Sequence, residues 1–154
     1  GSGETGLTLS GNFFNKKTLV GYHAIKTGKG HNDFSELQAL YSRPSTEHNW
    51  SDKKTMLLTN REVYSTANLF TCALKQAKNV TQIGGISGGG GGMPMTHYLP
   101  NGWLVVFPAN VLFDINKKHI ESGIEPDIEV TSTDADFDAG RDAIIEAALT
   151  ELMK

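Results

Sequence analysis

Ser65 is the side chain in this sequence whose position first indicates chemistry. It lies between a short apolar segment at 55–59 and a segment starting at Thr66 in which apolar residues recur at helical spacing. A serine at the start of a helix can act as an N-cap, and position alone favours that interpretation. The same position suits a nucleophile, because free N–H groups and the helix dipole stabilise an oxyanion. No Gly-x-Ser-x-Gly motif surrounds Ser65, so the signature of an α/β-hydrolase is missing.

A glycine-rich segment is the second feature. The chain holds 17 glycines, and they are concentrated between Gly84 and Gly92. A flexible linker is one interpretation. The segment directly follows a strand-like run and precedes a hairpin, which favours a structured turn that another backbone can approach closely. No Gly-Lys-Ser/Thr follows it, so a phosphate-binding loop has no support.

Metal sites and cofactors are not expected. The five histidines show neither His-x-x-x-His nor Glu-x-x-His spacing, and the acidic run at 134–138 lacks the glycine and distal glutamate of a calcium loop. The acidic run is better explained as negative charge placed before the last helix. The single cysteine, Cys72, excludes an internal disulfide and a cysteine-rich zinc site.

The composition predicts one globular domain over residues 1–154. Hydrophobic residues make up 38% of the chain and charged residues 20%, and the net charge is -3. No basic run exceeds two residues, so a nucleic-acid partner is not expected. No apolar run is long enough to serve as an integral membrane segment.

Periodicity predicts an α/β arrangement of elements that would position these residues. Residues 26–52 are polar and are expected to form a long excursion. The apolar face of the last helix should comprise Ile144, Ile145, Ala148, Leu149 and Leu152. The predicted elements are a helix at 4–14, strands at 18–25 and 55–59 (the latter covered on both faces), a helix at 66–78, a strand at 80–83, a hairpin turning at 98–104, strand-like segments at 111–115 and 120–130, and a helix at 138–153.

Several segments together resemble one protein family. These segments are NREVYSTANLFTCALK at 60–75, the glycine-rich stretch at 80–92, LPNGW at 99–103 and GIEPDIEV at 123–130. In order and spacing they are similar to the catalytic domain of the tail-specific, or C-terminal-processing, serine peptidases. The resemblance covers nearly the whole chain. It implies a crotonase/ClpP-like α/β core and hydrolysis of peptide bonds in peptide or protein substrates.

The resemblance also implies roles for individual residues. Ser65 matches the nucleophile, and the amide of Thr66 matches one oxyanion donor. The other donor comes from a glycine in an upstream Asn-x-Gly-Gly turn, for which Gly1 or Gly3 is the candidate remnant, although Gly1 could equally be a cloning scar. Glu121 matches the glutamate that completes the site. The turn glycines Gly88, Gly89 and Gly90 are expected beside the substrate, which could add as a strand.

One departure from the family bears on the general base. In the processing-peptidase branch a lysine on the glycine-rich turn activates the serine, and spacing puts that position at Gly90. No lysine lies between Lys78 and Lys117. The sequence therefore looks closer to the tricorn-core branch, whose base is a histidine from an N-terminal region. This chain is expected to be a fragment without that cap or PDZ-type region, and alone to have little or no peptidase activity. His31 and His97 are weaker candidates for a base within the chain.

Two other functions remain open on sequence grounds. One is a non-catalytic peptide- or lipid-binding module, as in retinoid-binding proteins that resemble this fold. The other is a scaffold domain in which Ser65 is merely a cap. Oligomeric state is open as well, since Trp103, Phe107 and Phe113 could face a core or a partner. A periplasmic or other extracytoplasmic location is an expectation from the family alone.

Overall fold

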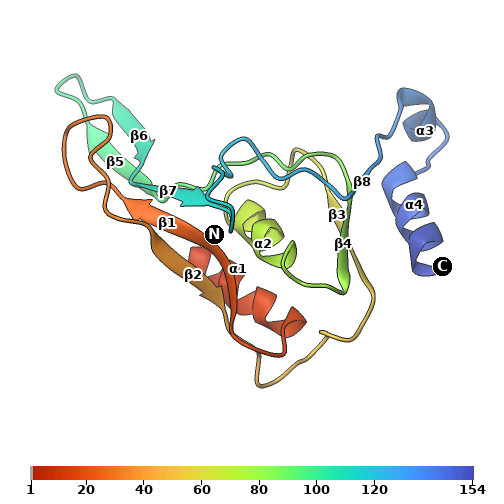
Figure 1. Ribbon diagram of the computed structural model, residues 1–154. Helices are drawn as coiled ribbons and strands as arrows, with labels where there is room; N and C mark the ends of the chain where they lie inside the picture. The colour runs from red at the N-terminus through yellow and green to blue at the C-terminus, as the bar shows by residue number, and fades with distance from the viewer. Residues whose placement is uncertain (1) are drawn as a thin grey trace.

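The computed structural model describes residues 2–154, which form a mixed α/β domain (Figure 1). The prediction of an α/β fold is confirmed at this level. The helices are α1 (Gly3–Ser10), α2 (Thr66–Leu74), α3 (Asp134–Asp138) and α4 (Ala143–Leu152), with a 3-10 turn, η1, at Gly11–Phe13. The strands are β1 (Thr18–Ile25), β2 (Gln38–Ser42), β3 (Thr55–Thr59), β4 (Val80–Gly84), β5 (Pro94–Tyr98), β6 (Leu104–Pro108), β7 (Asn110–Phe113) and β8 (Ile128–Glu129).

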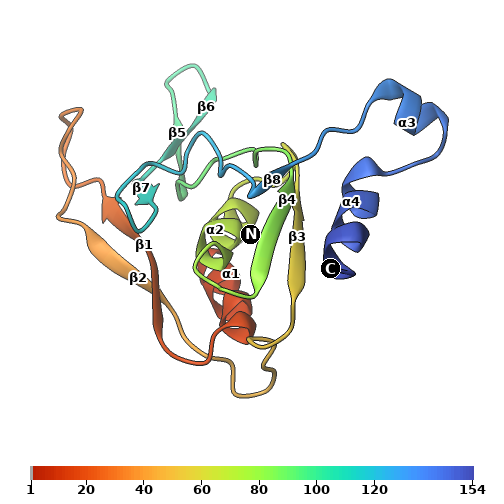
Figure 2. The same cartoon turned by 45° about the vertical axis from the view of Figure 1, so that its right-hand side comes forward.

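The strands form three small sheets. An antiparallel sheet has the order β2-β1-β7, a parallel sheet has the order β3-β4-β8, and β5 and β6 form a separate hairpin. Helices α1 and α2 lie between the first two sheets, and α4 lies on the outer face of the parallel sheet (Figure 2). Helix α2, which Ser65 precedes, packs against α1 and β1.

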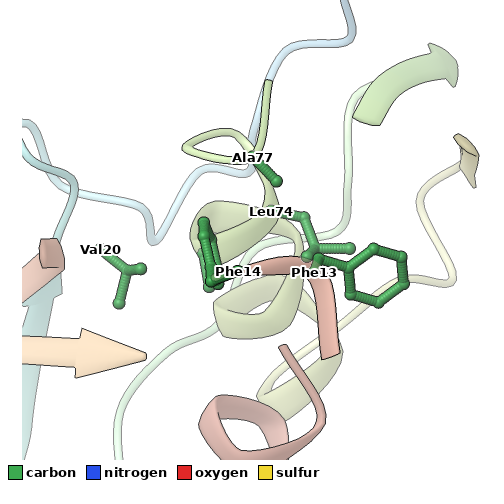
Figure 3. Packing of buried hydrophobic residues seen from close by; sticks show 6 residues of the cluster. Phe13, Phe14, Val20, Leu74 and Ala77 are labelled. Carbon is green, nitrogen blue, oxygen red and sulfur yellow. The ribbon is translucent and has the colours of Figure 1, made fainter. Parts of the chain in front are cut away.

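The core fills the space between the antiparallel sheet and α2. Phe13 and Phe14 follow α1 and cluster with Leu74 at the end of α2. Ala77, in the turn after α2, and Val20 of β1 complete the cluster (Figure 3). All five side chains are buried. Burying a large apolar side chain stabilises a domain by about 1.5–3 kcal/mol, so this cluster fixes α1 and α2 to β1.

Two sequence predictions need correction in the first half of the chain. The polar excursion at 26–52 contains β2, in which Leu40 pairs with Gly21 of β1. Strand β2 has only five residues and polar flanks, so its sequence shows no clear strand pattern. Its pairing with β1 stabilises it. Strand β3 was predicted to be covered on both faces. It lies at the edge of the parallel sheet, and Leu58 is 40% exposed.

The C-terminal segments also differ from the prediction. The acidic run forms its own short helix, α3, which Thr133 and Asp136 begin with a capping box. After a break, Asp142 caps α4. Its face toward the sheet carries Ile144, next to Gly84, and the buried Ala148. The other predicted apolar positions of this helix, Ile145, Leu149 and Leu152, are exposed, and within 120–130 only Ile128–Glu129 is a strand.

No helix within residues 2–154 is long and apolar enough to cross a membrane.

Candidate active site

Ser65 occupies the N-cap position of α2 in an unusual backbone conformation. Its φ is 61° and its ψ is -120°. Its side chain makes no capping hydrogen bond with any described residue. A non-glycine residue in such a conformation costs about 1–3 kcal/mol and persists only where the surroundings impose it. Here the Ser65 N–H donates to the carbonyl of Gly89 at 2.9 Å, and Tyr64 forms a bridge with Gly89. The fold therefore holds Ser65 under strain with its hydroxyl unused.

A groove of about 1020 Å³ opens in front of Ser65. Helices α1 and α2 both begin at this groove, since Gly3 and Thr66, their first residues, line it. The first N–H groups of a helix have no partner within that helix, and the helix dipole is positive there. The N–H groups of Gly3 and Thr66 are therefore backbone groups of this groove suited to stabilise an anion. Gly1, the other glycine considered as a donor, lies outside the described residues.

Gly6 allows the two helix starts to lie close together. A Cβ atom at Gly6 would be 3.2 Å from the carbonyl oxygen of Thr66 and 3.1 Å from its Cγ2. That spacing is tighter than ordinary van der Waals contact, so a larger residue would push α1 away from α2. The glycine at this position therefore sets the separation of the two helix starts at the groove.

The glycine-rich segment is a structured turn, so the flexible-linker interpretation is wrong. Gly84 is the last residue of β4, and the N–H of Gly85 donates to Thr59 at 2.8 Å. Farther along, the N–H of Gly88 donates to the carbonyl of Val63 at 2.8 Å. These bonds hold the turn against the segment that leads into Ser65.

Gly90 occupies the position of the lysine in the related branch, and any side chain there would displace the exposed ring of Tyr64. Its φ is +65°, where glycine is favoured, and an added Cβ would overlap the ring of Tyr64. Gly88 and Gly89 face protein backbone, at the carbonyls of Arg61 and Glu121. The part of the turn that lines the groove is instead Gly91 and Gly92, which the sequence did not single out.

Glu121 contacts the glycine turn. Its carbonyl accepts the N–H of Gly90 at 3.1 Å, and its carboxylate accepts the N–H of Gly91 at 3.0 Å. The structure thus places Glu121 against the glycine turn, and its expected part in completing the site stays a prediction. Glu121 itself does not line the groove, but its carboxylate holds Gly91, which does.

A buried network of hydrogen bonds, which the sequence analysis did not predict, connects α2 with the glycine turn and the segment 120–124. Asn68 is fully buried, and its amide donates to the carbonyl of Ile120 at 2.9 Å. The Ser87 hydroxyl donates to Asn68 Oδ1 at 2.6 Å and accepts the N–H of Ile124 at 2.7 Å. The network therefore joins α2, the glycine turn and the segment that carries Glu121. An asparagine within an apolar helix was the available signal, since buried polar groups need partners.

Among the histidines, His23 is the one that lines the groove within the described chain. It lies on β1 and is half-buried. The sequence had instead named His31 and His97, which lie in the loop after β1 and on β5. The alternating pattern at 18–25 predicted that His23 lies on a strand. It did not predict which face of the strand borders the groove. The groove also carries charged side chains on the α1 and β2 side: Glu4, Arg43 and Glu47.

Other chemistry finds little support in the described residues. No cluster of three potential metal ligands occurs within 2–154. Burial raises the pKa of the Cys72 thiol to about 12, and the negative charge of Asp114 adds to the shift. A thiol so hard to ionise is a poor nucleophile. Ser65 is therefore the candidate nucleophile that combines a groove, strain and free backbone donors.

A family model decides the assignment. The model of peptidase family S41 matches residues 1–130. The chain belongs to peptidase family S41. The resemblance to the tail-specific serine peptidases is thereby confirmed. No curated protein sequence matches the chain.

Solved structures of S41 peptidases share the fold. A candidate peptidase from Parabacteroides merdae is 40% identical, with a TM-score of 0.93, and the match covers 100% of this chain and 49% of that one. Mature CPAF in complex with lactacystin is 14% identical over 99% of this chain and 40% of its own, with a TM-score of 0.77. The photosystem II D1 C-terminal processing protease is 15% identical over 85% and 32%, with a TM-score of 0.60. The chain spans about half the length, or less, of these structures.

Proposed function

We propose that residues 1–154 form the nucleophile domain of an S41 serine endopeptidase with a crotonase/ClpP-like core. The observation that carries the proposal is Ser65, held at positive φ with an unused hydroxyl, in a groove where two helices begin. Strained residues are concentrated at functional sites. A capping role is poorly supported, because the Ser65 side chain makes no capping bond with the described residues.

In this mechanism the Ser65 hydroxyl attacks the carbonyl carbon of an extended peptide. The carbonyl oxygen becomes an oxyanion, which the N–H groups of Thr66 and Gly3 stabilise by hydrogen bonding. A general base takes the hydroxyl proton and later delivers it to the leaving amine. An acyl-enzyme forms as the peptide bond breaks, and water then hydrolyses it.

The peptide lies along the glycine turn in this proposal. Backbone hydrogen bonds from a strand-like peptide give affinity independent of its side chains. Gly91 and Gly92 line the groove there, and glycines let the peptide backbone approach closely. Glu121 acts through the turn, since its carboxylate and carbonyl fix the N–H groups of Gly91 and Gly90. Gly88 and Gly89 hold the turn against residues 63–65 through backbone hydrogen bonds.

The general base is proposed to be a histidine outside this 154-residue chain, as in the tricorn-core branch. The Ser65 side chain makes no capping hydrogen bond with the described residues, and a glycine stands at position 90, where the related branch has its lysine. The chain alone should therefore have little or no peptidase activity. His23 is the in-chain residue against which this proposal must be tested, because it lines the same groove.

Labelling of Ser65 by a fluorophosphonate, with and without added imidazole, tests the proposal. Free imidazole can act as a soluble base, and we expect it to accelerate labelling about tenfold, less than the 10²–10⁴ of a positioned base. Ser65→Ala should abolish labelling. Ser45→Ala, another serine of the groove lining, is the matched control and should label like the wild type.

Two results would count against these assignments. Rapid labelling without imidazole that is lost in His23→Gln would assign the base to His23 and refute an external one. Absence of Ser65 labelling at every imidazole concentration, in a folded chain, would refute the nucleophile and favour a peptide- or lipid-binding module.

A further inference from the structure

One face of the antiparallel sheet brings polar side chains to the Ser65 groove. Asn110 and Leu112 are two residues apart on β7, so their side chains lie on the same face of the sheet. Leu112 pairs with His23 of β1, which shares that face. All three residues line the groove. Asn110 and His23 are therefore the polar side chains that β7 and β1 contribute to the groove wall.

The side-chain amide of Asn110 is held in one orientation. Its Oδ1 accepts the N–H of Met93 at 2.5 Å, and the Met93 carbonyl accepts the N–H of Ala109 at 2.8 Å. A backbone N–H can only donate, so the oxygen of the amide must face Met93 and the NH2 group must lie on the other side. Within residues 2–154, Nδ2 of Asn110 has no hydrogen-bond acceptor. Asn110 therefore holds the end of the glycine turn with its oxygen and keeps its N–H donors unused.

The glycine turn passes directly beside Asn110. A Cβ atom added at Gly92 would lie 3.1 Å from the carbonyl oxygen of Asn110, and one added at Gly91 would lie 2.9 Å from Leu112 Cδ1. The groove-lining part of the turn is thus in contact with β7. A ligand that lies along Gly91 and Gly92 is thereby brought next to the Asn110 side chain.

Three backbone N–H groups of this part of the turn already have partners. The N–H groups of Gly90 and Gly91 donate to the carbonyl and the carboxylate of Glu121, and the N–H of Met93 donates to Asn110. A backbone carbonyl that enters the groove here cannot bond to these groups without displacing a partner. A carbonyl that finds no donor loses its hydrogen bonds to water, which weakens binding. The unused N–H groups of Asn110 are donors at this wall that can replace water.

We propose that Asn110 binds the peptide substrate by donating a hydrogen bond from Nδ2 to a backbone carbonyl. In the proposed function, on which this inference rests, an extended peptide lies along Gly91 and Gly92. Every peptide presents backbone carbonyls whatever its side chains, so the bond gives affinity for the peptide backbone itself. Asn110 is thus a substrate-binding residue that holds the peptide against the glycine turn.

Nuclear magnetic resonance of the ¹⁵N-labelled chain tests this proposal directly. The probe is the blocked, uncharged peptide acetyl-Ala-Leu-Ala-Ala-Ala-amide, whose side chains carry no polar group. We expect the Nδ2–H signals of Asn110 to shift as the peptide binds. Asn101 is the matched control, because its Oδ1 also accepts a backbone N–H, that of Trp103 at 3.1 Å, but it lies outside the groove lining. The Nδ2–H signals of Asn101 should not move.

The variant Asn110→Asp removes the donor and keeps the anchor of the turn. Its carboxylate can still accept the N–H of Met93, and near-UV circular dichroism checks that the variant folds. The lost hydrogen bond should raise the dissociation constant of the peptide about tenfold. Because the peptide is uncharged, the added charge neither attracts nor repels it as a whole. Asn101→Asp adds the same charge away from the groove and should bind the peptide like the wild type.

Two results would overturn the proposal. One is that the Asn110 signals stay in place throughout the titration, and the other is that Asn110→Asp binds the peptide as tightly as the wild type. Ser65 labelling is measured separately and distinguishes the two levels of the proposal. If Ser65 fails to label while the Asn110 signals shift, the nucleophile is refuted and the peptide-binding role of Asn110 stands. If Ser65 labels and Asn110→Asp binds normally, only the role of Asn110 is refuted.

Discussion

The replacement Ser87→Ala tests how firmly the site is fixed from behind. The Ser87 hydroxyl bonds to Asn68 Oδ1 and to the N–H of Ile124, and both Ser87 and Asn68 are about 1% exposed or less. Alanine removes both bonds and leaves two buried polar groups without partners. The wild-type hydroxyl therefore joins α2 to the segment after Ile120 at a place that water does not reach.

The magnitude follows from the two groups left unpaired. A buried donor or acceptor without a partner costs about 1–3 kcal/mol. Ser87→Ala should therefore lower the free energy of unfolding by about 2–4 kcal/mol, because partial relaxation lets the groups find weaker partners. For a chain of this size, one kcal/mol corresponds to about 2–4 °C in Tm. The expected fall in Tm is about 10 °C.

Urea unfolding followed by circular dichroism measures this effect, with Ser35→Ala as its control. The Ser35 hydroxyl also accepts a backbone N–H, from Ile25 at 3.1 Å, and donates to a carbonyl, that of Glu36. These bonds are exposed, so water replaces them, and the cost should stay below about 1 kcal/mol. The two variants thus lose the same number of hydrogen bonds and differ in burial.

The reasoning fails if Ser87→Ala and Ser35→Ala destabilise the chain equally. It also fails if Asn68→Ala and Ser87→Ala are fully additive, since residues that share a hydrogen bond should show coupling of at least about 0.5 kcal/mol. Either result would mean that the network does not fix the position of the turn.

Three further predictions concern single residues of the core and the site. Because glycine tolerates φ of 61° without strain, Ser65→Gly should be about 1 kcal/mol more stable to urea than Ser65→Ala, and equal stability would refute strain at this residue. Gly90→Lys should lower stability by about 2 kcal/mol and leave fluorophosphonate labelling unchanged, because its side chain meets Tyr64; a gain in labelling would contradict this geometry. The pKa of Cys72 rises from 9.0 to about 12 on folding, so the folded chain keeps its thiol proton above pH 9 while the unfolded chain loses it. Stability should therefore fall by about 1.4 kcal/mol between pH 8 and pH 10, and Cys72→Ala should lack this pH dependence in urea titrations.

The local sequence pattern was sufficient to predict the elements whose own residues favour that structure. The strand at 18–25 has the bounds that alternation predicts, and the hairpin turns at Gly102, where φ is +85°. The prediction failed where a distant partner decides. Strand β2 forms because Leu40 pairs opposite Gly21, and a pairing across such a separation leaves no local trace.

Burial was harder to predict than secondary structure. The apolar positions of α4 were expected on one covered face. Ile144 packs against Gly84 of the parallel sheet and Ala148 is buried, whereas Leu149 and Leu152 are exposed. Hydrophobic spacing says which residues can be buried together. It does not say how wide the neighbouring element is.

The sequence by itself determined the family, the order of the main elements and the serine that begins α2, because these depend on residue types at fixed spacing. The tertiary structure decided the rest. It put Ser65 at positive φ through Gly89, placed His23 in the groove lining, and left the β5–β6 hairpin exposed. The physical reason is common to all three. Backbone strain, side-chain direction and exposure depend on which distant segments pack together, and residues far apart in the sequence make those contacts.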